Sequence, residues 1–116
     1  MLLICYPKCS TCRKAEEWLK HHQIDYRYRD IKANPPSVAE LTEWHQASGL
    51  PLKRFWNTSG MQYRALNLKS RLIEMNEAQQ LALMSTDGML IRRPILVGNG
   101  SVLVGFREKQ WLEHLR

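Results

Sequence analysis

Two cysteines stand two residues apart near the start of the chain, in the run Pro7-Lys8-Cys9-Ser10-Thr11-Cys12-Arg13-Lys14. A cysteine thiolate is a good nucleophile, and a second thiol one helical turn away can close a disulfide with it. The run lies where an apolar segment gives way to a helical pattern, and a helix N-terminus favours an anionic sulfur. Lys8 and Arg13 add positive charge, so we expect the pKa of Cys9 to fall below its free value of about 8.5. The motif predicts thiol–disulfide chemistry, with Cys9 as the nucleophile and Cys12 as the resolving thiol.

A C-x-x-C pair can also be half of a zinc site with four cysteine or histidine ligands. No second C-x-x-C or H-x-x-H pair follows, and His21, His22 and His45 are the remaining candidate ligands. Ordinary surface or core histidines explain these three more simply, so the pattern favours redox chemistry without a bound metal or other cofactor. The third cysteine, Cys5, lies in an apolar run, where a buried and unreactive thiol is the favoured interpretation.

The elements that must position this motif begin with a βαβ unit. Residues 2–6 are an apolar run that ends at Pro7, as is typical of a buried strand. Residues 10–22 carry apolar side chains at helical spacing, and residues 26–31 alternate between apolar and charged side chains as a half-buried strand does. Because a helix connects the two strands, they are expected to be parallel.

The middle of the chain is predicted to be mostly helical. Ser37 and Glu40 form a capping-box signal for a helix that ends at Gly49. Asn76 and Gln79 form a second such signal, for a helix that continues to about residue 86.

The last third is predicted to be a hairpin followed by a helix. Residues 95–97 and 102–104 flank Gly98-Asn99-Gly100-Ser101, a strong hairpin signal, and the final helix starts at about Arg107. Side chains expected to be buried by the predicted helices include Val38, Leu41, Trp111, Leu112 and Leu115.

A βαβ unit followed by a ββα unit is the thioredoxin-like arrangement. The sequence therefore predicts an α/β, thioredoxin-like fold with a helical insertion of roughly 50 residues, about residues 37–88, between the two halves. No linker-like composition divides the chain, so residues 1–116 are expected to form a single domain.

A second motif, Arg92-Arg93-Pro94, stands immediately before the hairpin. In the thioredoxin-like arrangement a proline at this position packs beside the catalytic cysteine, often after a cis peptide bond. We expect Arg93 to face Cys9, where it would hold an oxyanion or stabilise the thiolate. For Arg92, such a role and a solvated surface position are equally favoured.

Length and charge narrow the class of protein further. The chain has 116 residues and a net charge of +6, but its basic residues are spread along the whole sequence. Without a basic patch or an RNA-binding aromatic signature, we expect no direct nucleic-acid binding.

No apolar run approaches the roughly 20 residues of a membrane span, and no basic segment of a signal peptide precedes the first apolar run. A cytoplasmic protein without membrane contact is predicted.

These motifs together resemble the arsenate reductase (ArsC)/Spx family of thioredoxin-fold proteins. The matching segments occur in family order over nearly the whole chain and comprise residues 6–14, 35–37, 63–68, 87–95 and 104–106. The resemblance implies that Cys9 attacks an arsenic oxyanion or a disulfide, with glutathione, glutaredoxin or thioredoxin as the electron donor. Candidate substrate-binding residues are Lys8, Arg13, Arg92 and Pro94, and the candidate catalytic residues are Cys9, Cys12 and Arg93.

The resemblance also identifies positions where this sequence departs from arsenate reductases. Their pocket uses three arginines, of which Arg93 matches one. The second position holds Asn57, and the third lies near Phe106, with Arg107 beside it. The alternative implied by the same resemblance is an Spx-like regulator, in which a Cys9–Cys12 redox switch controls binding to the RNA polymerase α subunit through a surface near Gly49.

Overall fold

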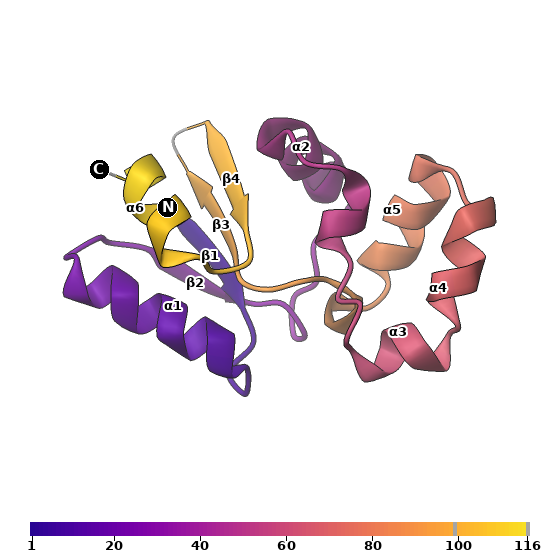
Figure 1. The fold of residues 1–116 in the computed structure, drawn as a ribbon, viewed down its shortest axis with the longest axis horizontal. Helices are drawn as coiled ribbons and strands as arrows, with labels where there is room; N and C mark the ends of the chain where they lie inside the picture. The colour runs from indigo at the N-terminus through magenta and orange to yellow at the C-terminus, as the bar shows by residue number, and fades with distance from the viewer. Residues whose placement is uncertain (99, 116) are drawn as a thin grey trace.

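A computed structural model describes residues 1–98 and 100–115 and contains a four-stranded sheet in the order β2-β1-β3-β4 (Figure 1). The strands are β1 (Leu2–Cys5), β2 (Arg27–Asp30), β3 (Ile95–Gly98) and β4 (Ser101–Val104). β1 pairs with β2 in parallel and with β3 in antiparallel orientation, and β3 pairs with β4 in antiparallel orientation. The predicted α/β, thioredoxin-like fold is confirmed. Asn99, in the predicted hairpin turn, lies outside the described residues.

Helices α1 (Ser10–His21) and α6 (Glu108–Leu115) cover one side of the sheet (Figure 1). Successive side chains of a strand point to opposite faces, so Leu3 and Cys5 face these helices. Their buried partners include Leu19 of α1 and Trp111 of α6. This core holds the start of α1 against the end of β1.

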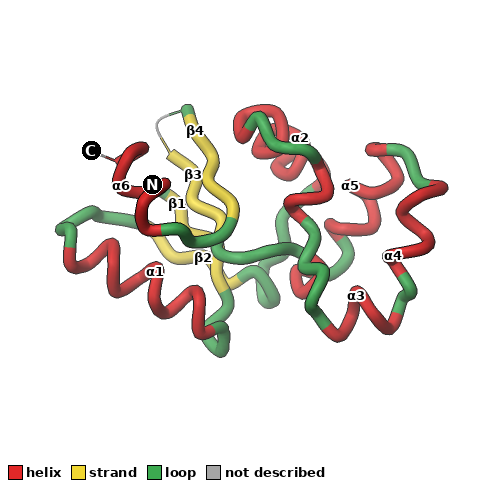
Figure 2. Tube along the Cα trace, in the orientation of Figure 1, coloured by secondary structure: helices red, strands yellow, loops and turns green. Residues whose placement is uncertain are grey.

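The segment between β2 and β3 is mostly helical and lies beyond the other side of the sheet (Figure 2). Its α-helices are α2 (Val38–Ser48), α3 (Met61–Ala65), α4 (Leu68–Arg71) and α5 (Glu77–Ser85), and its 3₁₀ helices are η1 (Leu52–Phe55), η2 (Leu72–Glu74) and η3 (Gly88–Leu90). Ile4, Ile95 and Val104 point into a second core shared with this segment. In the described part of the chain, no helix is long and apolar enough to cross a membrane.

Both predicted capping boxes form. Ser37 and Glu40 exchange side-chain and backbone hydrogen bonds at the start of α2, as Asn76 and Gln79 do at the start of α5. Gly49, with φ of 68°, ends α2 in the left-handed region that favours glycine.

Two predicted core positions are wrong. Val38 is 42% exposed, because it occupies the first residue of α2 and the buried stripe begins one turn later, at Leu41. Leu112 is 39% exposed, because its neighbour Trp111 takes the buried position and consecutive helical residues point about 100° apart.

A partly buried ion pair between Arg29 and Glu40 connects β2 to the start of α2. Arg29 donates from Nη1 to Glu40 Oε2 at 2.6 Å and from Nη2 to Glu40 Oε1 at 3.0 Å. The same guanidinium donates to the carbonyl oxygens of Asn34 and Pro35, each at 3.0 Å. The hydrogen bond from Arg29, aided by the Ser37 backbone N–H, lowers the pKa of Glu40 from 4.5 to about 2.

We predict that Glu40→Gln lowers the free energy of unfolding by about 1 kcal/mol at neutral pH, a value discounted because the carboxylate is partly exposed. A carboxyl whose pKa is lower in the folded state stabilises above its unfolded pKa, and this stabilisation is lost as the pH falls. The difference between wild type and variant should therefore shrink below the ordinary pKa of 4.5 and vanish near pH 2. Urea unfolding at neutral and acidic pH measures it. The exposed Glu43→Gln on the same helix is the matched control, and an equal loss there would contradict the prediction.

Candidate active site

Cys9 lies at the N-cap of α1, where its backbone is extended with φ −93° and ψ 119°. A tight turn after β1 brings it there, because the Cys9 N–H donates to the Tyr6 carbonyl at 3.0 Å. The first N–H groups of a helix have no partner within it and carry partial positive charge. Cys9 is partly exposed, so its thiol stands at an anion-favouring position that solvent can reach.

Cys12 lies in the first turn of α1, is buried and has a free thiol, as has Cys5 at the end of β1. Cys12 and Cys5 pack in one buried cluster, and the partly buried Cys9 packs against it. A hydrogen bond from Cys5 is the largest influence that lowers the pKa of Cys12, to about 7, and a backbone bond from Tyr6 and the charge of Arg93 act in the same direction against the effect of burial. The hydrogen bond to Cys12, together with burial, raises the pKa of Cys5.

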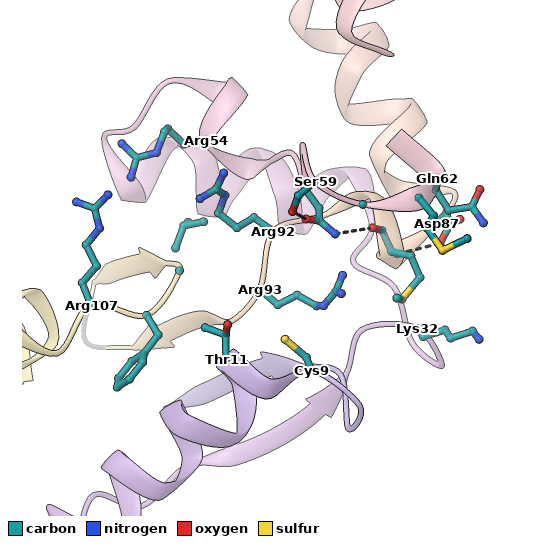
Figure 3. A pocket seen from close by; sticks show the side chains of 17 residues that line it. Cys9, Thr11, Lys32, Arg54, Ser59, Gln62, Asp87, Arg92, Arg93 and Arg107 are labelled. Atoms are coloured by element: carbon teal, nitrogen blue, oxygen red, sulfur yellow. Dashed lines mark hydrogen bonds between the residues drawn. The ribbon is translucent and has the colours of Figure 1, made fainter. Parts of the chain in front are cut away.

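A cavity of about 840 Å³ opens above Cys9 (Figure 3). The basic residues that line it are Lys32, Arg54, Arg92, Arg93 and Arg107. In Figure 3, Arg93 lies beside Cys9, with Arg54, Arg92 and Arg107 to one side and Lys32 to the other. The cavity therefore presents positive charge around the partly exposed thiol.

Arg92 and Arg93 each carry a buried hydrogen-bond donor without a partner among residues 1–98 and 100–115. Within the described residues, the Nε atom of each is buried and has no hydrogen-bond partner. Arg93 donates from Nη1 to the Ile91 carbonyl at 3.3 Å, and its guanidinium lies 5.6 Å from the centre of the Tyr6 ring. Buried donors without partners are uncommon, and guanidinium groups bind carboxylates and oxyanions well. The pair is suited to an anionic ligand.

Backbone hydrogen bonds hold the segment that carries these arginines against η1. The Arg92 N–H donates to the Phe55 carbonyl at 2.8 Å, and the Asn57 N–H donates to the Leu90 carbonyl at 2.8 Å. Nearby, Gly88 packs so closely that a Cβ atom would lie 2.0 Å from the Ile31 carbonyl oxygen. These contacts bring residues from η1 and from the end of η3 to the same cavity.

The structure brings together some of the predicted site residues. Cys9, Arg92 and Arg93 line the cavity, and Cys12 lies buried behind Cys9. Pro94 is buried and follows a cis peptide bond, in agreement with the cis bond considered from the sequence.

Lys8 and Arg13 are exposed and do not line the cavity, and Arg13 donates from Nε to the Pro7 carbonyl at 3.3 Å. In residues 1–98 and 100–115, no group of three or more His, Cys, Asp or Glu side chains is arranged to hold a metal ion.

Sequence reasoning missed two of the basic residues, Arg54 and Lys32. The family resemblance implied arginines at the position of Asn57 and near Phe106. Both of these residues line the cavity, and so do Arg54 and Arg107. Arg54 lies in η1, which ends at Phe55, and Asn57 follows two residues after that end, so the sequence offered only the nearness of Arg54 to Asn57 as a signal. Lys32, just after β2, has no comparable signal in the sequence.

The sheet order, the cysteine at the start of α1 and the proline before β3 define a thioredoxin-like protein with a cysteine-centred, cationic site. The sequence model of the ArsC family matches residues 5–114, and the chain belongs to this family.

Relatives of the chain include named regulators. The uncharacterized protein YusI of Bacillus subtilis is 50% identical over 109 residues, covering 94% of this chain and 92% of YusI. The regulatory protein MgsR of the same species is 32% identical, covering 93% of this chain and 84% of MgsR. Global transcriptional regulators named Spx also match.

Solved structures agree with this assignment. An ArsC family related protein from Bacteroides fragilis superimposes with a TM-score of 0.94 at 46% identity, covering 97% of this chain and 94% of the other. A possible arsenate reductase from Streptococcus mutans superimposes with a TM-score of 0.87 at 44% identity, covering 97% and 96%.

We predict that iodoacetamide alkylates Cys9 alone in the folded protein, because Cys5 is 0% and Cys12 is 1% exposed. All three cysteines should react in urea. Mass spectrometry of tryptic peptides counts and locates the label, and Cys9→Ser should take up none while folded. Equal native labelling of Cys12 would show that its thiol is accessible and would contradict the prediction.

Proposed function

We propose that the protein is an arsenate-reductase-like thiol–disulfide oxidoreductase with Cys9 as its nucleophile and Cys12 as its resolving thiol. One observation carries the proposal: the partly exposed Cys9 thiol stands at a helix N-terminus beside an arginine-lined cavity with unpartnered guanidinium donors. Each of these features favours attack by a thiolate on an anionic substrate.

In the first step, the Cys9 thiolate attacks a sulfur of a disulfide substrate and releases the other half as a thiol. Cys12 then attacks the Cys9 sulfur, expels the second half and forms a Cys9–Cys12 disulfide. With arsenate, the Cys9 thiolate bonds to arsenic, and one arsenate oxygen takes up protons and leaves as water. Cys12 then loses its proton and attacks the Cys9 sulfur, and the electron pair of the sulfur–arsenic bond stays on arsenic as arsenite departs. Glutathione or a protein thiol of glutaredoxin or thioredoxin type reduces the disulfide and restores both thiols.

The size of the cavity favours a substrate larger than a single oxyanion. Its volume of about 840 Å³ lies within the range of pockets that bind small organic molecules. Arg93 would hold the anionic group next to Cys9, and Arg92, Arg54 and Arg107 would bind further carboxylates. A glutathione adduct, with its two carboxylates, fits this distribution of charge. Lys8 and Arg13, outside the cavity, would contribute by attracting anions towards the motif, an effect that salt weakens.

Turnover with a glutathione mixed disulfide, and separately with arsenate, tests the proposal. Cys9→Ser should reduce both activities to the uncatalysed background, because Cys9 is the one cysteine among the described residues that line the cavity. Cys12→Ser should keep the first step, and its turnover should depend on the concentration of external glutathione. Full activity of Cys9→Ser in both assays would refute the proposal.

We further predict that Arg93→Gln lowers kcat/KM by about 10- to 150-fold, since a charge-assisted hydrogen bond is worth about 1.5–3 kcal/mol. The loss should be greater for anionic substrates than for an uncharged disulfide such as oxidised mercaptoethanol. Arg27→Gln, which removes an exposed arginine of β2, is the matched control. If both variants lose activity equally, the effect comes from net charge and not from a specific contact.

The similarity to MgsR and to Spx favours a second candidate, a redox-switched regulator that binds the RNA polymerase α subunit. In the oxidoreductase the cysteine pair carries out turnover, whereas in the regulator it controls binding to the α subunit. Capture on an immobilised C-terminal domain of the α subunit, with the protein oxidised or reduced, separates them. Redox-dependent binding together with absent turnover would favour the regulator, whereas turnover without binding would favour the oxidoreductase.

A further inference from the structure

The proposed mechanism does not use the third cysteine, Cys5. Cys5 is the last residue of β1 and is fully buried, with 0% of its surface exposed. Because side chains alternate along a strand, Cys5 points towards α1, into the same core cluster as Cys12 and partly buried Cys9. A residue expected to be inert packing therefore lies among the reactive thiols.

Cys12 is the central sulfur of this group. It is 1% exposed in the first turn of α1 and packs in one buried cluster with Cys5, against which the partly buried Cys9 also packs. Thiols that pack in one cluster can reach bonding distance by an adjustment of their side chains. Cys12 can therefore pair with either neighbour.

We propose that Cys5 is a second resolving thiol, which takes over the disulfide from Cys9 and forms a buried Cys5–Cys12 disulfide. This inference rests on the proposed function, because the relay begins from the Cys9–Cys12 disulfide of that reaction. After this transfer, Cys9 is a free thiol again, and the disulfide lies in the core between Cys5 and Cys12.

The step is balanced without any further oxidant or reductant. Cys5 gives up its proton and attacks the Cys12 sulfur, the Cys5–Cys12 bond forms, and the Cys9–Cys12 bond breaks with its electron pair on Cys9. The proton released by Cys5 compensates the negative charge on Cys9. One disulfide replaces another, so the protein remains oxidised by two electrons throughout.

The surroundings of Cys5 determine how this exchange behaves. The hydrogen bond to Cys12 and burial raise the pKa of Cys5, so little of it is ionised at neutral pH and the transfer is slow compared with the first oxidation. Its rate should increase about tenfold per pH unit as the thiolate fraction rises. The product suits the core, since a disulfide carries no ionisable group. The buried position also shields the disulfide from large reductants.

Trypsin distinguishes the two disulfides. Cleavage after Lys8 and Arg13 places Cys5 on the peptide of residues 1–8 and both Cys9 and Cys12 on the peptide of residues 9–13. A Cys9–Cys12 disulfide therefore stays within one peptide, whereas a Cys5–Cys12 disulfide joins two peptides.

The test oxidises the wild-type protein with one equivalent of glutathione disulfide, stops samples over time with iodoacetamide in urea, and analyses the peptides without reduction. We expect the internal Cys9–Cys12 disulfide first, with label on Cys5. The joined peptide with label on Cys9 should follow, faster at higher pH. Cys5→Ala is the matched control and should never give the joined peptide. Persistence of the first disulfide, with Cys5 labelled at all times and at alkaline pH, would overturn the relay while leaving the proposed function intact.

If the first disulfide does not form, the proposed function fails and a second variant decides the inference. Cys9→Ser retains only Cys5 and Cys12, and diamide accepts the two hydrogen atoms that their pairing releases. Formation of the joined peptide in this variant supports Cys5 as a partner of Cys12. Two thiols that remain free, or that oxidise only between molecules, would refute it.

Discussion

The site depends on the junction where β1 ends and α1 begins. β1 lies in the interior of the sheet, hydrogen-bonded to β2 on one side and β3 on the other, so its direction and register are strongly constrained. Only three residues separate its last residue, Cys5, from Cys9 at the N-cap of α1. The position of the thiol therefore follows from the packing of the sheet. The free N–H groups at the start of the helix make this a position that favours an anionic group.

The rest of the cavity is formed where the two parts of the structure meet. The sheet with α1 and α6 supplies Cys9 and Arg107, and the helical segment supplies Arg54 from η1. Arg92 and Arg93 lie on the connection between these parts, held by the backbone hydrogen bond from Arg92 to Phe55. Each guanidinium has a buried Nε atom without a partner in the part of the chain that the structure describes, and this arrangement costs stability unless an anion binds.

Features with a local physical cause could be predicted from the sequence. The capping boxes at Ser37 and Asn76 depend on residues three positions apart, and the cysteine pair depends on one helical turn. Contacts between distant residues could not be predicted in this way. Arg54 reaches the cavity only because η1 packs beside the Arg92 backbone, and Cys5 meets Cys12 only because β1 packs under α1. Val38 and Leu112 show the same limit, since periodicity identifies an apolar face but not where the packing partner ends.

The central claim is that Cys9 is the nucleophile and Cys12 resolves its adduct, and trapping that adduct tests the claim most directly. Cys12→Ser, incubated with a glutathione mixed disulfide and analysed by intact-mass and peptide mass spectrometry, should accumulate one glutathione on Cys9 and nowhere else. The wild-type protein under the same conditions should instead accumulate an internal disulfide without a retained glutathione. A variant that stays unmodified, or that carries the glutathione on Cys5, would contradict the account.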